Sequence, residues 1–334
     1  MARTLFKIVY SRFKQFGGLR VVRYYARMGA LRPLVRGIMR NPFSRRSVLG
    51  AYQKAVVIVG EHLKKQYESL MWERKDLYSA QDLVHEKSRI VWFCWLQGME
   101  QAPQIVKVCY ASLVKRLPDR EVRFVDGNNW KEYVELPDYI LKKWEKKQIP
   151  PAHFADILRL ELLIRYGGTW NDATVLCTGI TPENEKDTLS YLDADLFMFQ
   201  YTEPGSNQWG GISNWFISAC SNNEVLMVLR DMVFVYWKDY DCMIDYYIFH
   251  LFFSMLRAAY PEPIAAMPYG YSRRSLALGY NWGKRFDKEK WDRLTSKVCF
   301  HKLSYNVRDK VKKDKGNYYH FIVGGGGMES LNAE

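Results

Sequence analysis

The spacing of hydrophobic residues changes from helical to strand-like near the middle of the chain. Apolar side chains recur three or four residues apart over 154–165, which predicts an amphipathic helix. The glycine pair 167–168 follows, and glycine readily takes the backbone conformation that ends a helix. The β-branched and aromatic run 169–176 then predicts a strand that carries Asp172 to its end. Such a strand end is where open α/β sheets bind their ligands.

The flanking segments predict an α/β fold. An apolar strand at 88–98, a helix at 103–117 and a second strand at 121–126 have the strand–helix–strand order typical of a parallel sheet. The same kind of pattern predicts further strands at 195–200 and 297–306, and helices at 224–240 and 245–260. It also predicts helix over 51–87, which is apolar-periodic at 51–67 and polar and amphipathic at 70–85.

Basic residues are concentrated at the start of the chain. Residues 1–60 hold thirteen Lys and Arg and no acid, whereas the 36 basic and 36 acidic residues after them cancel. Aromatic and aliphatic residues alternate with the basic ones, a pattern that suits a helix lying on an anionic bilayer. Each Lys or Arg near such a surface contributes about 1 kcal/mol. We therefore expect residues 1–60 to dock on an anionic membrane surface.

Two other interpretations of this segment stay open, and a third lacks a supporting motif. The segment is also compatible with a solvated or disordered arm, and with an organellar transit peptide, since Arg-rich starts without acids look alike. A basic arm can also bind nucleic acid, but no nucleic-acid-binding motif accompanies it, so no nucleic-acid partner is expected.

The remaining composition favours a cytoplasmic protein. The chain contains no apolar run of about 18 residues, the length of a membrane span, and no clean apolar stretch of a secretory signal. Its six cysteines are scattered without a C-x-x-C pair, which favours reduced thiols over a disulfide framework or a zinc site. We expect a basic helical extension at 1–87, a globular domain at 88–323 and a flexible tail at 324–334, with the protein peripheral on the inner face of the cell membrane.

A specific set of polar residues accompanies the helix–glycine–strand pattern. Asp156 and Arg159 share one patch of the predicted helix because they are three positions apart, and Trp170 and Asp172 follow the glycine pair. Taken singly, such an ion pair is usually a surface feature and such an aspartate usually a turn residue. The complete string of D-x-x-R, L-L-x-x-Y-G-G and W-x-D resembles the sugar-nucleotide-binding core of DXD-type glycosyltransferases. The resemblance is to their capsular polysaccharide synthesis branch and, distantly, to the large clostridial toxin glucosyltransferases.

This resemblance covers roughly residues 88–305 and implies both a fold and a reaction. The fold would be a GT-A-like (Rossmann-like) mixed sheet flanked by helices. The reaction would be retaining transfer of a hexose from a UDP- or GDP-sugar to a saccharide or lipid-linked acceptor, usually with Mn²⁺ or Mg²⁺. Asp156 and Arg159 would hold hydroxyls of the donor sugar, and Asp172 would contact its ribose and sugar. These three are the residues expected to carry catalysis, and no catalytic base is assigned.

The metal-binding element departs from the family pattern. The family's D-x-D is here Asp172-Ala173-Thr174, and a hydroxyl is a poorer ligand than a carboxylate for hard cations. A metal held by Asp172 and Thr174 is therefore in question. Asp193-Ala194-Asp195 does spell D-x-D, but it lacks the preceding helix and glycine pair, and it stays the second candidate.

Other candidate residues follow from the same resemblance. Trp92 or Trp95 would stack on the nucleotide base, although core packing is the common alternative for either. In the closing H-K-L-x-Y element, His301 and Lys302 would approach the diphosphate, where a lysine can offset leaving-group charge as a metal otherwise would. The remaining candidates are Gln97, His153, Gly168, Asn171 and Asn214 on the donor side, and Asp245 and His250 on the acceptor side.

These observations predict a glycosyltransferase of capsular or cell-surface polysaccharide synthesis. The missing second acid keeps one alternative open, a non-catalytic sugar-nucleotide-binding or membrane-associated scaffold protein.

Overall fold

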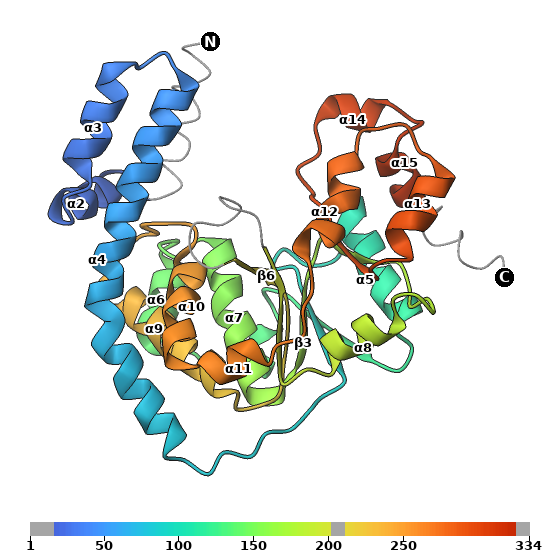
Figure 1. Cartoon of the computed structure of the whole chain (residues 1–334), viewed down its shortest axis with the longest axis horizontal. Helices are drawn as coiled ribbons and strands as arrows, with labels where there is room; N and C mark the ends of the chain where they lie inside the picture. The colour runs from blue at the N-terminus through green and yellow to red at the C-terminus, as the bar shows by residue number, and fades with distance from the viewer. Residues whose placement is uncertain (1–16, 202–210, 325–334) are drawn as a thin grey trace. The chain divides into compact units, whose positions relative to one another are not determined.

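A computed structural model describes residues 17–201 and 211–324 (Figure 1). The chain forms two compact units, each assembled from three separate stretches of sequence. The first comprises Met1–Asp82, Glu135–Leu160 and Glu224–Pro261, and the second comprises Leu83–Val134, Glu161–Asn223 and Glu262–Glu334. The structure thus groups the basic extension with two later helical stretches. The start of that extension, residues 1–16, and the tail from residue 325 lie outside the described residues.

The first unit is organised on the long helix α4 (Arg45–Ser79), drawn in blue in Figure 1. Its buried residues recur about every four positions and pack against α9 (Glu224–Asp239) and α10 (Ile248–Ala259). The sequence predicted helix over 51–87. The structure has one continuous helix that covers 51–79 and begins earlier, at Arg45, whereas residues 80–87 are not helical.

Polar contacts fasten α4 to α9 along this apolar stripe. Tyr67 Oη donates to Asp239 Oδ2 at 2.8 Å, and Tyr78 Oη donates to Asp231 Oδ2 at 2.7 Å. Burial, together with the bond to Asp239, raises the pKa of Tyr67 well above its usual value, so the phenol stays a donor. The described part of this unit also contains α2 (Leu19–Arg27), α3 (Leu31–Arg40), α6 (Asp138–Glu145) and the first part of α7 (Pro151–Tyr166).

The second unit contains a five-stranded sheet with the order β2-β1-β3-β6-β5. Strand β1 pairs in parallel with β2 and with β3, while β6 runs antiparallel to β3 and to β5. This is the predicted mixed α/β architecture. The strands are β1 (Ile90–Cys94), β2 (Glu121–Val125), β3 (Gly168–Asp172), β5 (Leu196–Gln200) and β6 (Ile212–Ala219).

The strand predicted at 169–176 is divided in two. Strand β3 ends at Asp172, as predicted, and β4 (Val175–Cys177) leaves the large sheet to pair antiparallel with β7 (Phe300–Lys302). The helix α5 (Gln104–Arg116) packs on both β4 and β2. The other elements of this unit are η1 (Trp130–Glu132), α8 (Glu185–Leu192), most of α11 (Pro261–Ala265), α12 (Ser272–Asn281), α13 (Lys288–Thr295), α14 (Asp309–Lys313) and α15 (Tyr318–Val323).

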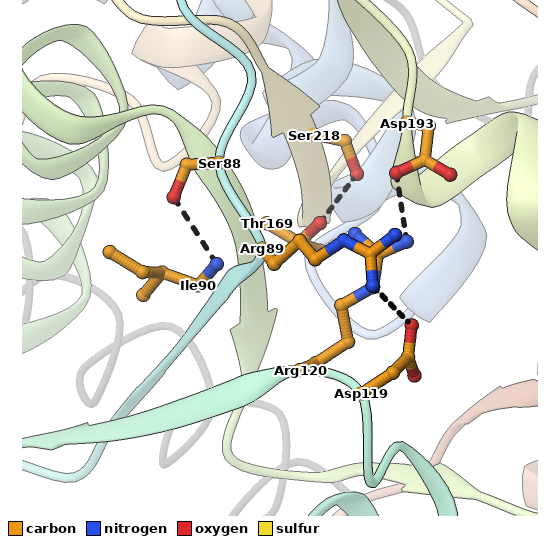
Figure 2. A network of polar contacts seen from close by, with 8 residues as sticks. All are labelled: Ser88, Arg89, Ile90, Asp119, Arg120, Thr169, Asp193 and Ser218. Carbon is orange, nitrogen blue, oxygen red and sulfur yellow. Dashed lines mark hydrogen bonds and ion pairs between the residues drawn. The ribbon is translucent and has the colours of Figure 1, made fainter.

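A polar network lies where the parallel strands begin (Figure 2). The buried guanidinium of Arg120, just before β2, pairs with Asp193 at 2.8 Å and with Asp119 at 3.5 Å. Arg89, just before β1, pairs with the same Asp119 at 3.4 Å. Since β5 and β3 are both antiparallel to β6, Asp193 precedes β5 at the edge opposite Asp172. The network therefore holds the amino ends of the strands together.

Within the described residues, no helix combines the length and the apolar composition needed to cross a bilayer.

Gly168, the first residue of β3, lies close to the backbone of β1. Its φ of +94° lies in the region that favours glycine, and a Cβ placed there would lie 2.3 Å from the carbonyl oxygen of Ile90. A side chain at this position would therefore push β3 away from β1. Gly168 was a candidate donor-binding residue, and the structure gives it this steric role.

We expect Gly168→Ala to lower the free energy of unfolding by about 2 kcal/mol or more, because both the φ angle and the contact with Ile90 are violated. Thermal denaturation measures the change. Gly50→Ala is the control, since Gly50 is helical and a Cβ there has open space, so the variant should be as stable as wild type or slightly more so. Equal melting temperatures for the two variants would contradict the steric role.

Candidate functional site

Three parallel strands of the second unit end at the same edge of the sheet. Cys94 of β1 is in register with Val125 of β2 on one side and with Asp172 of β3 on the other. Trp95 and Asp126, which follow β1 and β2 directly, therefore leave the sheet at the edge where Asp172 lies. Ligands of open α/β sheets bind at such carboxyl ends.

Asp172 is the centre of a compact polar cluster at this edge. Lys302 Nζ donates to Asp172 Oδ2 and to Thr174 Oγ1, both at 2.8 Å. Trp170 Nε1 donates to the other carboxylate oxygen of Asp172 at 2.9 Å. The side chains of Asp172 and Lys302 are 27% and 22% exposed, so a ligand in solvent can reach the pair. The structure thus brings Asp172, Thr174 and Lys302 together.

The pairing of β7 with β4 determines which residue of the H-K-L-x-Y element reaches Asp172. Lys302 is in register with Val175, next to the Ala173-Thr174 turn. Because successive side chains of a strand point to opposite faces, His301 points away from that cluster. His301 is fully buried, with Nε2 3.2 Å from Thr178 Oγ1. The structure therefore gives His301 a place in the core and no exposed atom for the expected contact with a diphosphate.

The same alternation separates the candidates on β3. Trp170 and Asp172 share one face, as their hydrogen bond shows, whereas Asn171 lies on the other. Asn171 is fully buried and donates from Nδ2 to the backbone oxygen of Asp172 at 3.2 Å. It supports the strand end and offers no exposed surface to a donor.

The two tryptophans of the 88–98 segment differ in the same way. Trp92 is fully buried, donates from Nε1 to the Gly167 carbonyl oxygen at 3.0 Å and packs edge-on against Tyr133. It is a core residue. Trp95 is half-buried and meets Tyr305 edge-on, with 5.3 Å between ring centroids. Trp95 is thus the aromatic candidate of this edge.

Other positions of the second unit add to the candidates. Gln97 is exposed in the turn after β1, and Asn214 is half-buried on β6. Two residues without a predicted role lie here as well: Tyr305 contacts Trp95, and Asp126 follows β2 at the same edge. Asp126 is the last residue of the strand predicted at 121–126, and this position at a strand end was a signal that could have identified it.

The first unit gathers the other predicted residues. Asp156 and Arg159 form an ion pair on α7, as their spacing predicted, and the Arg159 guanidinium lies 5.9 Å from the ring centroid of Phe249 on α10. Burial, and next the charge of Arg159, lowers the pKa of His250 to about 3, so this imidazole is neutral at pH 7. The structure thus places the ion pair of Asp156 and Arg159 next to the start of α10.

His153 and Asp245 complete this group. His153 Nε2 donates to the Tyr246 carbonyl oxygen at 3.3 Å, and burial lowers its pKa to about 4. Asp245 accepts a hydrogen bond from Tyr247 N at 2.6 Å, in the turn that precedes α10. Both side chains are buried. That the group around Arg159 meets Asp172 at one site stays a prediction.

The candidate metal ligands at Asp172 do not fit a divalent metal. They are the carboxylate of Asp172 and the hydroxyl of Thr174, and the ammonium of Lys302 already contacts both. At the second D-x-D string, Asp193 pairs with Arg120 at 2.8 Å and Asp195 pairs with Lys87 at 3.1 Å. Within the described part of the chain, no group of three or more His, Cys, Asp or Glu side chains is arranged to hold a metal.

Comparisons with known proteins give one family. A family model described as capsular polysaccharide synthesis protein matches residues 42–322. No curated protein sequence is significantly similar to this chain. A solved structure titled PaToxG Glycosyltransferase is 13% identical and aligns over 80% of this chain and 98% of its own, with a TM-score of 0.37. A TM-score this low does not establish a common fold.

The buried His301 predicts a pH dependence of stability. Burial lowers its pKa from 6.5 to about 3, so between these values the unfolded chain binds more protons than the folded chain. The stabilisation is therefore complete above pH 6.5 and is lost as the pH falls toward 3, by up to about 1.4 kcal/mol per pH unit. His301→Gln should reduce the slope of unfolding free energy against pH, measured by urea denaturation between pH 7.5 and 5. His62→Gln, on the exposed side of α4, should keep the wild-type slope. Identical slopes for both variants would argue against a neutral buried His301.

Proposed function

The chain belongs to the capsular polysaccharide synthesis protein family, and on this premise we propose that it is a glycosyltransferase. It transfers a hexose from a UDP- or GDP-sugar to a hydroxyl of a saccharide or lipid-linked acceptor. The bond from the anomeric carbon to the β-phosphate oxygen breaks, and a bond from the acceptor oxygen to that carbon forms. The nucleoside diphosphate leaves with the bonding electron pair, and the proton of the acceptor hydroxyl passes to the leaving diphosphate or to solvent. The expected retention of anomeric configuration is part of this proposal.

The observation that carries the proposal is the cluster at Asp172. A carboxylate at the end of a parallel strand, held by a lysine and an indole, is a fixed group at the edge where α/β sheets bind ligands. Trp95, Tyr305 and Gln97 offer aromatic and amide surface for a nucleotide and sugar at the same end of the second unit. In this proposal Asp172 contacts the ribose and sugar, while Asp156 and Arg159 hold sugar hydroxyls.

The first test is hydrolysis of a panel of UDP- and GDP-sugars. Its rate is measured as the release of the nucleoside diphosphate. We expect one donor to be turned over, and Asp172→Ala to reduce the rate by about a hundredfold or more, since a fixed charged group at the reacting centre is lost.

Asp195→Ala is the matched control, because Asp195 lies before β5 at the opposite edge of the sheet and pairs with Lys87. It should keep the wild-type rate. Because a transferase can require its acceptor for turnover, donor binding is measured by calorimetry in parallel. Neither turnover nor binding of any donor would sink the transferase proposal, whereas binding without transfer to any acceptor would favour the non-catalytic alternative.

We also propose that the protein is cytoplasmic and docks on the inner face of the membrane through its basic extension. In the described part of that extension, Arg32, Arg36, Arg40 and Lys54 line a pocket of about 560 Å³ between α3 and α4. Gly37 brings the helices close, since a Cβ there would lie 2.5 Å from the Cβ of Ala51. Four arginine or lysine side chains on one helical hairpin favour an anionic surface as partner.

Exposed apolar side chains accompany these charges. Met39 and Phe43 are 73% and 75% exposed, and Val35 and Leu49 are also exposed. An apolar side chain next to basic ones can enter the boundary between headgroups and acyl chains while the charges bind the headgroups. Binding at this surface would place the enzyme near lipid-linked acceptors.

Vesicle sedimentation tests this docking. Replacing Arg32, Arg36 and Arg40 with Gln should weaken binding to vesicles containing phosphatidylglycerol by roughly a hundredfold, at about 1 kcal/mol for each charge. The control replaces Lys310, Lys312 and Lys313 of α14 with Gln, which removes the same charge from the second unit and should leave binding unchanged. Equal loss in both triple variants would show a nonspecific charge effect, and equal retention would exclude docking through α3.

A further inference from the structure

The turn Asp172-Ala173-Thr174 holds an ammonium group where its resemblance to D-x-D leads one to expect a metal ion. Lys302 Nζ lies 2.8 Å from Asp172 Oδ2 and 2.8 Å from Thr174 Oγ1. We propose that Lys302 supplies the positive charge that binds the donor's diphosphate, so that nucleotide binding requires no divalent cation. This inference rests on the proposed function and deepens it.

The backbone fixes the lysine at this turn. Lys302 pairs with Val175 across the β4–β7 ladder, and the next residue, Leu303, donates from N to the Thr174 carbonyl oxygen at 2.8 Å. The start of the Lys302 side chain is therefore held beside the turn by strand pairing. A long flexible side chain held at its root loses less freedom on binding an anion than one on a loop.

The charges at the turn leave little attraction for a metal. The carboxylate of Asp172 is the single acidic group of the donor set, and the ammonium of Lys302 compensates its charge. A divalent cation bound to the same oxygen would lie within a few ångströms of that ammonium and be repelled by it. Mg²⁺ sites typically use one or two carboxylates together with substrate phosphates. A single carboxylate whose charge a lysine compensates therefore attracts Mg²⁺ weakly.

The ammonium retains the capacity to bind a phosphate. Lysine has three N–H donors, and two of them are directed at Asp172 and Thr174. Among the residues that the structure describes, Lys302 has no third hydrogen-bond acceptor, and its side chain is 22% exposed. The third donor is thus available for a diphosphate oxygen, and lysine binds phosphate as a point charge.

A purely structural ion pair is the competing explanation. Lys302 would then only brace the β4–β7 ladder against the end of β3, and its loss would change stability without changing nucleotide affinity. Affinity and stability must therefore be measured on the same variants.

The experiment titrates the full-length protein with UDP and with GDP by isothermal titration calorimetry, once in EDTA and once in Mn²⁺. The variants are Lys302→Met, which removes the charge, and Lys302→Arg, which keeps it. Lys297→Met is the matched control, an exposed lysine of the segment that leads into β7. Thermal unfolding of each variant is recorded alongside, and Mn²⁺ binding to wild type is followed by electron paramagnetic resonance.

We expect wild type to bind one of the two nucleotides in EDTA with a Kd within about twofold of its Kd in Mn²⁺. Lys302→Met should weaken this binding by roughly tenfold or more, the loss of one charge-assisted hydrogen bond. Lys302→Arg should retain most of the affinity, and Lys297→Met all of it. If Lys302→Met fails to fold, the comparison of EDTA with Mn²⁺ on wild type and Lys302→Arg decides.

Two outcomes would overturn the inference and leave the transferase function standing. One is nucleotide binding by wild type that appears only with Mn²⁺, together with a bound Mn²⁺ signal. The other is wild-type affinity in a folded Lys302→Met. No binding of UDP or GDP in either buffer would overturn the inference and the proposed function together.

Discussion

The alternation of side chains along β-strands is the constraint on which the second unit's candidate site depends. At the end of β3 it gives Trp170 and Asp172 one face and buries Asn171 on the other. On β7 it points Lys302 at Asp172 and sends His301 into the core. A shift of β3 by one residue would place the amide of Asn171 where Asp172 now lies. The same shift of β7 would place the imidazole of His301 where Lys302 now lies. The register of the sheets is therefore part of the site's chemistry.

The glycine pair at the start of β3 helps to fix the same register. The Gly167 carbonyl oxygen accepts a hydrogen bond from the Trp92 indole. Because Gly168 has no Cβ, the carbonyl oxygen of Ile90 fits next to it. Both contacts join the start of β3 to β1, five and four residues before Asp172. Because β1 also pairs with β2, fixing this junction aligns three strand ends at one edge. The motif's glycines thus act through backbone geometry, and its acid acts at the edge that the geometry defines.

Much of this was predictable from local patterns, and the exceptions have a common cause. The helix over 154–165, the strand ending at Asp172 and the ion pair of Asp156 with Arg159 each depend on residues close in sequence, and the structure has all three. The division of the strand after Asp172 depends on β7, more than a hundred residues later. The burial of Trp92 and His301 depends on neighbours such as Tyr133 and Thr178, which only the folded chain brings near. The helix predicted over 51–87 is a local pattern as well, and α4 contains it as far as Ser79.

The positive charge of the site comes from a residue far in the sequence from the carboxylate that it pairs with. Two acids in a D-x-D turn recruit a metal locally, through residues two positions apart. Here the positive charge comes from Lys302, 130 positions beyond Asp172, and it arrives only when β7 pairs with β4. Contacts of such separation form late in folding, because the entropy of closing the intervening loop must be overcome first. A chain lacking β7 would keep the D-A-T sequence and its carboxylate but lose the compensating charge. The segment around residues 297–306 is therefore as much a part of the site as the motif that first identified it.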